Sequence, residues 1–506
     1  MEYSNWQQVE SKLEQAEIKL PPNARLVQDS RNVVAGDVFV ALKGIEQDGA
    51  AYLAKAFQSG AVAALVSSNC DESLYQSSEQ VVVIEDLENR LAEIAKNFYM
   101  KGRTVPMPII GVTGTNGKTS VSHLLAQLSH ICLKQEAAVI GTMGAGSINA
   151  LEATSNTTPG VTEIYRLVKD FSERGFGSMT MEVSSHALDQ GRIKGLDIDV
   201  AIFTNLTLDH LDYHGDMESY FQAKAKLFSD YSPKCAVINL DDEYGERLAE
   251  QVSENTRVIA YGQSEKVKAY SDHVFIKSFE CHTQGLVLEL ECQVIGAKEQ
   301  TQLLLPIYGE FNGSNIAAVY ATALALNWPI QAIQFSQLSA VPGRLEMFVA
   351  QEQPVAIVDY AHTPDALEQS LKAVRKHLSG ELYVIFGCGG DRDKSKRPVM
   401  GKIAETLADH IIITNDNPRS EEPEQIVKDI EEGIEQASYQ IIYDRKRAIQ
   451  FALAKATAKD AILIAGKGHE TYQVIGDEII NYDEREFVKN QMKQLAKQEQ
   501  SGAQHD

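Results

Sequence analysis

The sequence lacks long apolar segments, paired cysteines and basic stretches. No uninterrupted apolar run approaches the ~18 residues of a membrane span, so no transmembrane helix is predicted. The six cysteines are scattered without a C-x-x-C pair, which favours reduced thiols over disulfides or a zinc site. Met1 to Glu10 lacks the basic and apolar regions of a signal peptide, so we expect a cytoplasmic protein.

Positive charge is scarce as well. The chain has 47 Lys and Arg residues against 70 Asp and Glu residues, a formal net charge of −23. No basic stripe is evident, which argues against nucleic acid as a partner. We expect a monomer that acts on small molecules. An anionic substrate would need locally gathered cations, such as those of residues 391–397 (Asp-Arg-Asp-Lys-Ser-Lys-Arg).

The most specific motif runs from Ile109 to Thr119 (Ile-Ile-Gly-Val-Thr-Gly-Thr-Asn-Gly-Lys-Thr). A buried strand pattern leads into glycines that bring backbone N–H groups close to phosphate, and a lysine and a threonine open a helix. The strict G-x-x-x-x-G-K-[S/T] pattern fails at Val112, so this is a shortened variant, and an ordinary glycine turn is the alternative. The predicted ATP-binding residues here are Gly114, Thr115, Asn116, Gly117, Lys118 and Thr119.

Alternating apolar strands and helical stretches predict an α/β protein, and 506 residues suggest about three domains. We expect a small N-terminal α/β domain over residues 1–100, to which the family resemblance described below assigns the UDP substrate. A central P-loop-type ATP-binding domain with a parallel sheet is expected over residues 101–338. A C-terminal Rossmann-like, amino-acid-binding domain is expected over residues 339–506, because strand patterns restart after Val341-Pro342-Gly343-Arg344.

Polar side chains follow two apolar runs of the expected central sheet. Glu182 ends the run at 179–182, and His210 comes soon after the run at 200–204. Ligands of open α/β sheets gather beyond the carboxyl ends of strands, so we expect both side chains beside the ATP turn. A carboxylate, an imidazole and the Thr119 hydroxyl suit Mg²⁺. The alternative is that both are loop residues satisfied by backbone groups.

Lys224 is predicted to point inward. In the helix 217–228 it lies at i+4 from Tyr220 and i+3 from Phe221, on the apolar stripe. A lysine in apolar surroundings loses its proton more easily, and its free amine can react with CO₂ to give a carbamate, N6-carboxylysine. A lysine that extends from the edge of the stripe is the alternative. The predicted catalytic residues are Lys118, Glu182, His210 and Lys224, and the predicted metal ligands are Thr119, Glu182, His210 and Lys224.

Hydroxyls, amides and a guanidinium are expected to face the same cleft, although each taken alone is more often a turn or cap residue. They are Asn156, Thr157, Thr158, Ser184, Gln190 and Arg192, and they suit a substrate that bears carboxylates.

The C-terminal part has polar residues after three strand patterns. Asp359 and His362 follow one strand, where they could hold a base or ribose. In Asp416-Asn417-Pro418-Arg419 the proline stiffens the loop and presents an arginine suited to a carboxylate. Glu470, in Gly466-Lys467-Gly468-His469-Glu470, could hold an ammonium group. An arginine and a carboxylate on adjacent loops would bind an amino acid, while the first loop can also serve as a helix entry.

From about Arg25 to Gln473 the chain resembles the Mur ligase family of peptidoglycan precursor synthesis. The residues behind the resemblance are Asp29-Ser30-Arg31 with Gly36-Asp37, the turn at 114–119, Glu182 to His186, Asp209 to Gly215, Tyr220 with Ala223-Lys224, Phe311-Asn312 with Asn315, Val341 to Arg344, and Gly466 to Glu470. In that family Asp416 to Arg419 matches the motif that selects meso-diaminopimelate over lysine.

The resemblance implies an ATP-dependent ligase that adds meso-diaminopimelate to the D-glutamate side-chain carboxylate of UDP-N-acetylmuramoyl-L-alanyl-D-glutamate through an acyl phosphate. It implies UDP near Ser30, ATP at the central turn with Asn312, Arg344, Asp359 and His362, two Mg²⁺ ions and a carbamylated Lys224. It also implies the muramoyl dipeptide at Asn156, Thr157, Thr158, Ser184, Gln190 and Arg192, and diaminopimelate at Arg392, Asp416, Asn417, Arg419, Gly466 and Glu470.

The chain departs from the family pattern at two places, and three alternative functions remain open. Ile45-Glu46 replaces a His-Gln type pair of many relatives, and Ala50-Ala51 stands where others often have basic residues, which leaves the uridine contacts open. The alternatives are a lysine-adding ligase, a folylpolyglutamate synthase-like ligase, and a nucleotide-dependent regulator that binds the muropeptide without ligation. Retention of Lys118, Glu182, His210 and Lys224 argues against the regulator.

Overall fold

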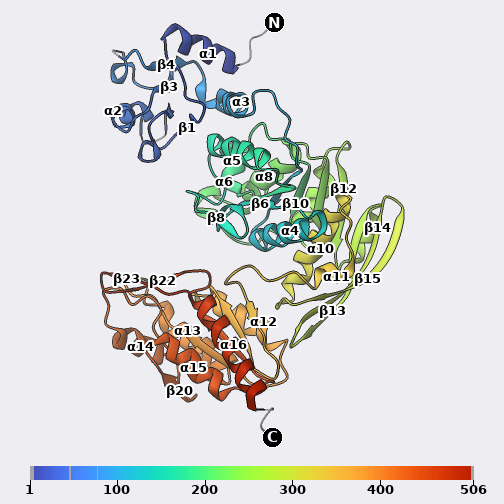
Figure 1. The fold of residues 1–506 in the computed structure, drawn as a ribbon. Helices are drawn as coiled ribbons and strands as arrows, with labels where there is room; N and C mark the ends of the chain where they lie inside the picture. Colours follow the sequence, from blue (N-terminus) through green and yellow to red (C-terminus); the bar gives the residue numbers. More distant parts are fainter. Residues whose placement is uncertain (1–4, 45–46, 77, 503–506) are drawn as a thin grey trace. The chain divides into compact units, whose positions relative to one another are not determined.

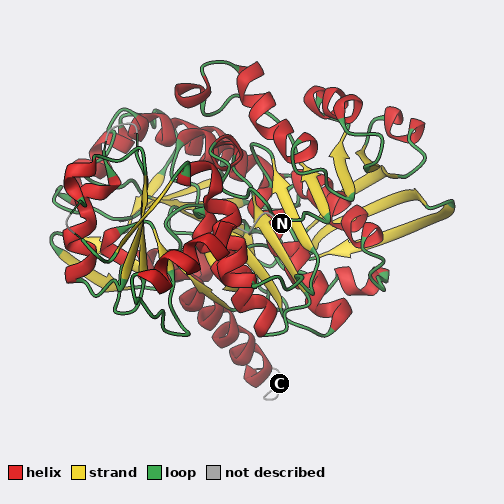
Figure 2. Cartoon of the chain, turned by 90° about the horizontal axis from the view of Figure 1, so that it is seen from above, coloured by secondary structure: helices red, strands yellow, loops and turns green. Residues whose placement is uncertain are grey.

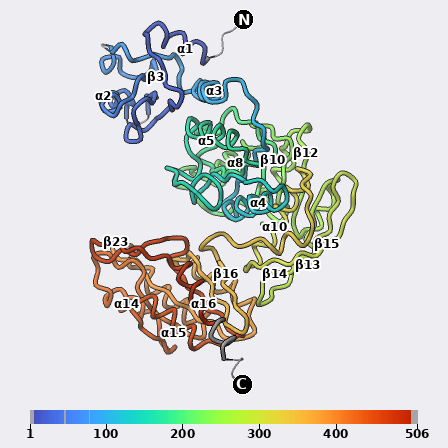
Figure 3. Tube along the Cα trace, viewed as in Figure 1, coloured from blue at the N-terminus to red at the C-terminus, as the bar shows by residue number. Residues whose placement is uncertain are grey.

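The computed structural model of the protein describes residues 5–44, 47–76 and 78–502 (Figure 1), and Figure 3 traces the path of the chain. The chain divides into two compact units. The first comprises the described parts of residues 1–238 and 242–258, and the second those of residues 239–241 and 259–506. No helix in the described part of the chain has the length and apolar composition of a membrane span.

The first unit opens with the predicted small α/β domain, whose sheet is parallel. Its strands lie in the order β1-β2-β3-β4, and every neighbouring pair is parallel. The strands are β1 (Leu26–Val27), β2 (Val38–Ala41), β3 (Ala63–Ser67) and β4 (Val81–Ile84). The helices are α1 (Asn5–Gln15), α2 (Leu53–Gln58) and α3 (Leu87–Met100), with 3₁₀ turns η1 (Ser30–Asn32), η2 (Gly49–Tyr52) and η3 (Glu72–Leu74). Strands β2 and β3 are buried throughout, as expected for apolar runs covered on both faces.

The rest of the first unit is built around seven strands of a larger sheet, in the order β11-β10-β5-β9-β6-β7-β8. Strands β5 (Ile109–Thr113), β6 (Ala137–Gly141), β9 (Ser178–Glu182), β10 (Val200–Phe203) and β11 (Cys235–Asn239) pair in parallel, and β7 (Gly144–Ser147) and β8 (Ala150–Glu152) are antiparallel additions. The helices are α4 (Lys118–Leu133), α5 (Val161–Glu173), α6 (Ser185–Asp189), α7 (Leu211–His214), α8 (Met217–Ser229) and α9 (Glu243–Gln251). Because β5, β9 and β10 are parallel neighbours, their carboxyl ends place Gly114, Glu182 and Thr204 at one edge.

The second unit begins with long strands that the sequence analysis did not anticipate. Strands β13 (His273–His282), β14 (Gly285–Val294) and β15 (Ala297–Leu305) form antiparallel pairs, and β12 (Arg257–Gly262) pairs with β13 in parallel. Buried and half-buried residues alternate along β14, because α10 (Phe311–Ala325) packs against one face of these strands. The 3₁₀ turn η4 (Glu265–Ala269) and the short helix α11 (Ala332–Phe335) complete this part.

The C-terminal sheet has the order β16-β17-β21-β18-β19-β20, with only β16 antiparallel. Its strands are β16 (Glu346–Phe348), β17 (Val355–Asp359), β18 (Leu382–Phe386), β19 (His410–Ile413), β20 (Tyr439–Ile441) and β21 (Ala461–Ala465), followed by the hairpin β22 (Tyr472–Ile475) and β23 (Glu478–Asn481). The helices are α12 (Pro364–Arg375), α13 (Lys396–Leu407), α14 (Pro423–Glu431), α15 (Arg445–Lys455) and α16 (Glu484–Gly502).

Helices cover both faces of this sheet, which confirms the predicted doubly wound arrangement. One apolar cluster joins alternate strand residues such as Ile357 to Leu371 and Met400 from α12 and α13. The other joins the intervening residues, such as Val358, to Ile449 of α15. Figure 2, which colours the elements by type, shows strands flanked by helices. Polar residues at the strand ends are therefore the ones free to meet ligands.

Truncation of one central side chain is expected to weaken the C-terminal sheet. Leu463 lies in β21, between β17 and β18, and is fully buried. We expect Leu463→Ala to lower the free energy of unfolding by about 2–5 kcal/mol, because it removes buried methyl groups and leaves a cavity. Leu304→Ala in β15, where the leucine is 61% exposed, is the matched control. Chemical denaturation measures both, and equal losses would contradict the assigned core.

Candidate active site

The predicted strand, glycine turn and helix are all present. β5 ends at Thr113 and α4 begins at Lys118, with the turn between them. Gly114 has φ +148°, and a Cβ atom there would lie 1.9 Å from the Thr204 hydroxyl oxygen. Gly117 has φ +86° and caps α4. Both positions therefore require glycine, and the turn places the N-terminus of α4 where it favours an anion.

Lys118 folds back over the turn. Its Nζ donates to the carbonyl oxygens of Gly114, at 2.8 Å, and Thr115, at 2.9 Å. Burial lowers the pKa of Lys118, and the charges of Glu182 and Asp209 oppose that shift. Thr115 and Asn116 donate their backbone N–H groups to Asn205, at 2.9 Å each, so Asn205 holds the turn in place. The lysine is thus positioned over the turn before any ligand arrives.

Glu182 is the buried carboxylate at the end of β9, with 1% of its surface exposed. One oxygen accepts from the Thr119 hydroxyl at 2.9 Å, and the other accepts from the Thr142 backbone N–H at 3.0 Å. Burial raises the pKa of Glu182, and these hydrogen bonds with the charge of Lys118 act in the opposite direction. A Cβ atom at Gly141 would lie 2.2 Å from the carboxylate, so β6 must end in a glycine here. Thr119 and Glu182, predicted to share a site, are brought together.

Lys224 points inward from α8, as predicted, and is 2% exposed. Its Nζ donates to the carbonyl oxygen of Gly114 at 2.9 Å and lies 4.6 Å from the centre of the Tyr220 ring. Burial lowers the pKa of Lys224 well below its usual value, and the charge of Lys118 lowers it further. Lys226, in contrast, forms an ion pair with Asp189 at 2.8 Å. The structure therefore separates an interior amine from an outward one.

His210 lies in an exposed loop with φ +53°, beside other aromatic rings. Its ring centre is 5.1 Å from that of His186 and 6.0 Å from that of Tyr220, and its Nε2 is 3.4 Å from Asp209. The described residues contain no group of three or more His, Cys, Asp or Glu side chains disposed to hold a metal ion. The predicted set includes only two such side chains, and its carboxylate and hydroxyl oxygens fit the preference of Mg²⁺.

Five of the six predicted dipeptide-binding residues form one network beside Glu182. The Thr158 hydroxyl donates to the Glu182 carbonyl oxygen at 2.8 Å, and Arg192 donates to the Thr158 carbonyl oxygen, also at 2.8 Å. The remaining members are Ser184, 3.3 Å from Thr158, Gln190, which accepts from Arg192 at 2.6 Å, and Thr157, 3.2 Å from Thr142. Asn156 is exposed and donates to Ser155 at 3.2 Å. Sequence reasoning missed Thr142, although its place directly after β6 was a usable signal.

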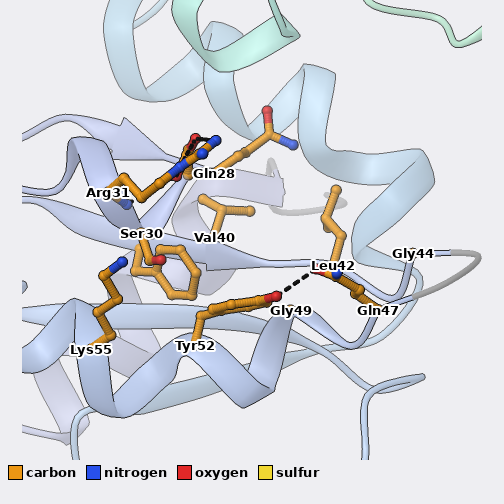
Figure 4. A pocket seen from close by; sticks show the side chains of 12 residues that line it. Gln28, Ser30, Arg31, Val40, Leu42, Gly44, Gln47, Gly49, Tyr52 and Lys55 are labelled. Carbon is orange, nitrogen blue, oxygen red and sulfur yellow. Dashed lines mark hydrogen bonds and ion pairs between the residues drawn. The ribbon is translucent and has the colours of Figure 1, made fainter.

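Ser30 belongs to a pocket of about 530 Å³ in the N-terminal sheet (Figure 4). Figure 4 shows the Lys55 side chain and the Tyr52 ring on the same side of the pocket as Ser30. Tyr52 donates its hydroxyl to Gln47 at 2.5 Å, and Asp29 caps η1 and pairs with Arg31 at 2.7 Å. The pocket therefore contains the Lys55 ammonium group, the hydroxyls of Ser30 and Tyr52, and the Tyr52 ring. Ile45 and Glu46, the departure noted in the sequence, lie outside the described residues, whereas Ala50 is buried in η2.

The predicted amino-acid-binding residues gather on three loops of the second unit. Arg419 donates to the Gly390 carbonyl oxygen at 2.7 Å. A Cβ atom at Gly389 would lie 2.9 Å from Arg419 Nη1 and 3.7 Å from Arg392 Cγ, so both arginines flank this glycine. Asn417 donates to Glu470 at 3.2 Å. The remaining two predicted residues are Asp416 and Gly466. Asp416 is buried, and a Cβ atom added at Gly466 would lie 3.6 Å from it. Two guanidiniums and a carboxylate thus lie on adjoining loops.

Main-chain bonds tie the arginine loop to the hairpin β22–β23. Arg419 has φ +52°, donates its backbone N–H to Val474 at 3.2 Å and accepts from Gly476 at 2.7 Å. The Asn417 side chain accepts from the Val474 backbone N–H at 2.9 Å. The backbone of the hairpin therefore holds this loop in place, and the sequence analysis did not predict that contact.

Four further predicted ATP-binding residues belong to the second unit, and their role stays a prediction. The Asn312 amide donates to the Tyr308 carbonyl oxygen at 2.7 Å and accepts from Asn315 at 2.9 Å. Asp359 is buried and accepts from Leu345 N–H at 2.9 Å and from the Ser370 hydroxyl at 2.6 Å. The exposed pair are Arg344, 5.7 Å from the Tyr360 ring centre, and His362, whose Nδ1 is 2.7 Å from the Tyr360 carbonyl oxygen.

These features define a multidomain α/β enzyme that uses a nucleoside triphosphate. The Mur ligase middle domain matches residues 112–323, the Mur ligase glutamate ligase domain residues 343–468, and the Mur ligase family catalytic domain residues 25–99. The chain belongs to the Mur ligase family.

Similar proteins span nearly the whole chain. The UDP-N-acetylmuramoyl-L-alanyl-D-glutamate--2,6-diaminopimelate ligase of Vibrio vulnificus is 43% identical over 91% of this chain and 92% of the relative. The ligase of the same name from Coxiella burnetii is 39% identical over 92% of this chain and 94% of the relative. A solved structure with that name matches with a TM-score of 0.71 at 34% identity, over 93% of this chain and 95% of the other. A MurF ligase from Thermotoga maritima in complex with ADP, 17% identical with a TM-score of 0.58 over 94% of this chain and 98% of the other, shares the fold.

A methyl group in the glycine turn is expected to block nucleotide binding. We expect Gly114→Ala to raise the Kd for ATP at least about tenfold, or ~1.4 kcal/mol, because the added atom would displace Thr204 and Asn205. Gly175→Ala is the control, since Gly175 also has a positive φ, +72°, but nothing lies within 4 Å of its added Cβ. Calorimetric titration measures both. Unchanged affinity in Gly114→Ala would remove the turn from the nucleotide site.

Proposed function

We propose that this chain is an ATP-dependent ligase of cytoplasmic peptidoglycan precursor synthesis. It joins an amine of meso-diaminopimelate to the D-glutamate side-chain carboxylate of UDP-N-acetylmuramoyl-L-alanyl-D-glutamate. The observation that carries the proposal is the pair Arg419 and Arg392 around Gly389, close to the Asn417–Glu470 pair. Two guanidiniums suit a diacid, and a carboxylate suits an ammonium group. The names of the relatives from Vibrio vulnificus and Coxiella burnetii agree with this substrate.

The first step activates the carboxylate. A D-glutamyl side-chain oxygen forms a bond to the γ-phosphorus of ATP, and the bond from that phosphorus to the β–γ bridging oxygen breaks. ADP departs, and the D-glutamyl side chain becomes an acyl phosphate. Lys118, held over the glycine turn, supplies positive charge to the phosphates. Mg²⁺ neutralises further phosphate charge when bound, and Thr119, Glu182, His210 and a carbamylated Lys224 would hold it.

The second step forms the amide. The diaminopimelate nitrogen bonds to the activated carbonyl carbon, the bond from that carbon to the phosphate oxygen breaks, and inorganic phosphate and a proton are released. Holding both reactants replaces a bimolecular encounter by an oriented one. Because the nucleotide turn and the amino-acid loops belong to different units of the chain, turnover requires a closed arrangement of the two units.

The other substrate contacts follow from the networks described above. Ser30 and its pocket would take the uridine diphosphate part, with Lys55 as a cation on the same side. The muramoyl dipeptide would be positioned beside Glu182 by a hydrogen-bonded set of residues, namely Thr142, Thr157, Thr158, Arg192 and Gln190. Asn156 and Ser184 would complete that site. We propose that the enzyme acts as a monomer.

Carbamylation of Lys224 is part of the proposal. The amine nitrogen forms a bond to the carbon of CO₂, one carbon–oxygen double bond becomes a carboxylate, and the nitrogen loses a proton. Only the neutral amine reacts, and burial with the nearby Lys118 charge lowers the pKa of Lys224 in the required direction. The product turns a buried cation into an anionic oxygen ligand close to the Gly114 carbonyl.

The reaction itself is the direct test. Phosphate release should require the muramoyl dipeptide and meso-diaminopimelate together, and mass analysis should find the tripeptide product. L-Lysine, which lacks one carboxylate, should be a poor substrate, and Arg419→Met should lower kcat/KM for meso-diaminopimelate about 10- to 100-fold. Arg447→Met, at an exposed arginine of α15, should leave kcat/KM unchanged. Equal turnover of lysine would assign the chain to the lysine-adding ligases, and binding without product would make it a regulator.

A second test concerns the carbamate. Lys224→Ala should lose ligase activity, because it removes the predicted anionic ligand. Added bicarbonate should not restore activity, whereas a short carboxylic acid should recover part of it by occupying the vacated space. Lys226→Ala, at the outward lysine two positions along α8, should remain active. Full activity of Lys224→Ala without additives would rule out the carbamate.

A further inference from the structure

A buried lysine lies at the centre of the amino-acid loops, in a position that the mechanism above does not use. Lys467 follows β21, and its side chain has no exposed surface. Its Nζ lies 2.5 Å from Asn417 Oδ1 and 2.9 Å from the Tyr472 carbonyl oxygen. It also lies 3.4 Å from Glu470 Oε2 and 3.4 Å from Asp416 Oδ1. A fully buried ammonium group is stable only when it is paired in this way.

The lysine sets the orientation of the Asn417 amide. Asn417 Oδ1 faces two groups that can only donate, Lys467 Nζ and the Val474 backbone N–H, at 2.5 and 2.9 Å. The atom that meets two donors must be the oxygen, so the Nδ2 group is directed to Glu470, at 3.2 Å. Without the Lys467 donor, the preference for this orientation rests on Val474 alone.

The lysine also balances the local charge. The charged groups that face Lys467 are Asp416 and Glu470, which attract it, and Arg445, which repels it. Arg445 is in turn neutralised by Glu484 in a buried ion pair. The Tyr472 ring centre lies 5.7 Å from Nζ. Burial lowers the pKa of Lys467, and the two carboxylates oppose that shift. Lys467 is therefore the counter-charge between two carboxylates on neighbouring loops.

We propose that Lys467 is the positioning residue of the amino-acid site, which holds Asn417 and Glu470 in the arrangement that receives the ammonium group of the incoming amino acid. The inference rests on the proposed function, because the ligand is the amine substrate of that reaction. Lys467 has no exposed surface, so it acts through its two partners and not by contact with the substrate. Lys467, Glu470 and Asp416 together carry one net negative unit, which suits an ammonium group.

The consequence of removing the cation is selective. Two carboxylates without their counter-charge repel each other, and Asn417 Oδ1 loses one of its two donors. The site then loses the arrangement that receives the ammonium group. The nucleotide turn and the dipeptide network belong to the other unit. The four predicted ATP-binding residues of the second unit are not among the hydrogen-bond and charge partners of Lys467 described above, so ATP and dipeptide binding should not change.

The test compares full-length Lys467→Met with wild type in steady-state ligation. The KM for meso-diaminopimelate should rise about 10- to 100-fold at neutral pH, while the KM values for ATP and for the muramoyl dipeptide stay within about twofold. Lys489→Met, at an exposed lysine of α16, is the matched control.

A second variant tests the inference if Lys467→Met fails to fold. Lys467→Gln keeps an N–H donor toward Asn417 and Tyr472 but removes the charge, and it should show the same selective rise, smaller in size. In a Glu470→Gln background, Lys467→Met should change the KM for the amino acid by no more than about threefold, because the residues act as a unit.

The outcomes separate the two proposals. Wild-type enzyme that forms no tripeptide would overturn the proposed function and this inference with it. Active wild-type enzyme with an unchanged amino-acid KM in Lys467→Met and Lys467→Gln would overturn the inference alone. A parallel loss for all three substrates would make Lys467 a purely structural residue and would also overturn it.

Discussion

The backbone carbonyl of Gly114 accepts hydrogen bonds from two lysines, and the nucleotide site depends on that meeting. Lys118 Nζ and Lys224 Nζ lie 2.8 and 2.9 Å from this oxygen. Two ammonium groups on one acceptor repel each other, and the interior one is the more easily deprotonated. The approach is possible only because Gly114 has no side chain to strike Thr204. The absence of a side chain at Gly114 therefore permits both the turn and the meeting of the two lysines.

Both candidate sites use the same physical device, a charge buried at the end of a parallel strand and satisfied by neighbouring loops. Glu182 at the end of β9 is held by hydroxyls and a backbone N–H from two other segments. Lys467 after β21 is held by oxygens from the loop that follows β19 and from β22. A group with several partners from different segments fixes their relative positions, because any displacement leaves a buried charge unsatisfied. Precision at these sites thus comes from the cost of desolvating charge.

Local patterns in the sequence were enough for the parallel sheets and the nucleotide turn, whose apolar runs, glycines and helix start are consecutive residues. The inward position of Lys224 was also predictable, since helical periodicity alone decides it. Strands β13 to β15 were missed, although Leu288, Leu290 and Cys292 alternate with Glu289, Glu291 and Gln293. The contacts of Lys467 with Asn417 and of Thr142 with Glu182 could not be predicted, because these partners lie 50 and 40 residues away in the sequence. The metal, substrate and carbamate roles and the domain boundaries stay predictions.

The hairpin β22–β23 is continuous by main-chain hydrogen bonding with the loop that presents Asn417 and Arg419. A protein engineer who transplants residues 415–420 alone into another scaffold would bring the side chains without the backbone that holds them. The smallest portable cassette is that loop together with residues 466–481, which include the lysine, the carboxylate and both strands of the hairpin. The proposed amino-acid site is thus formed by two distant stretches of sequence that must be exchanged together.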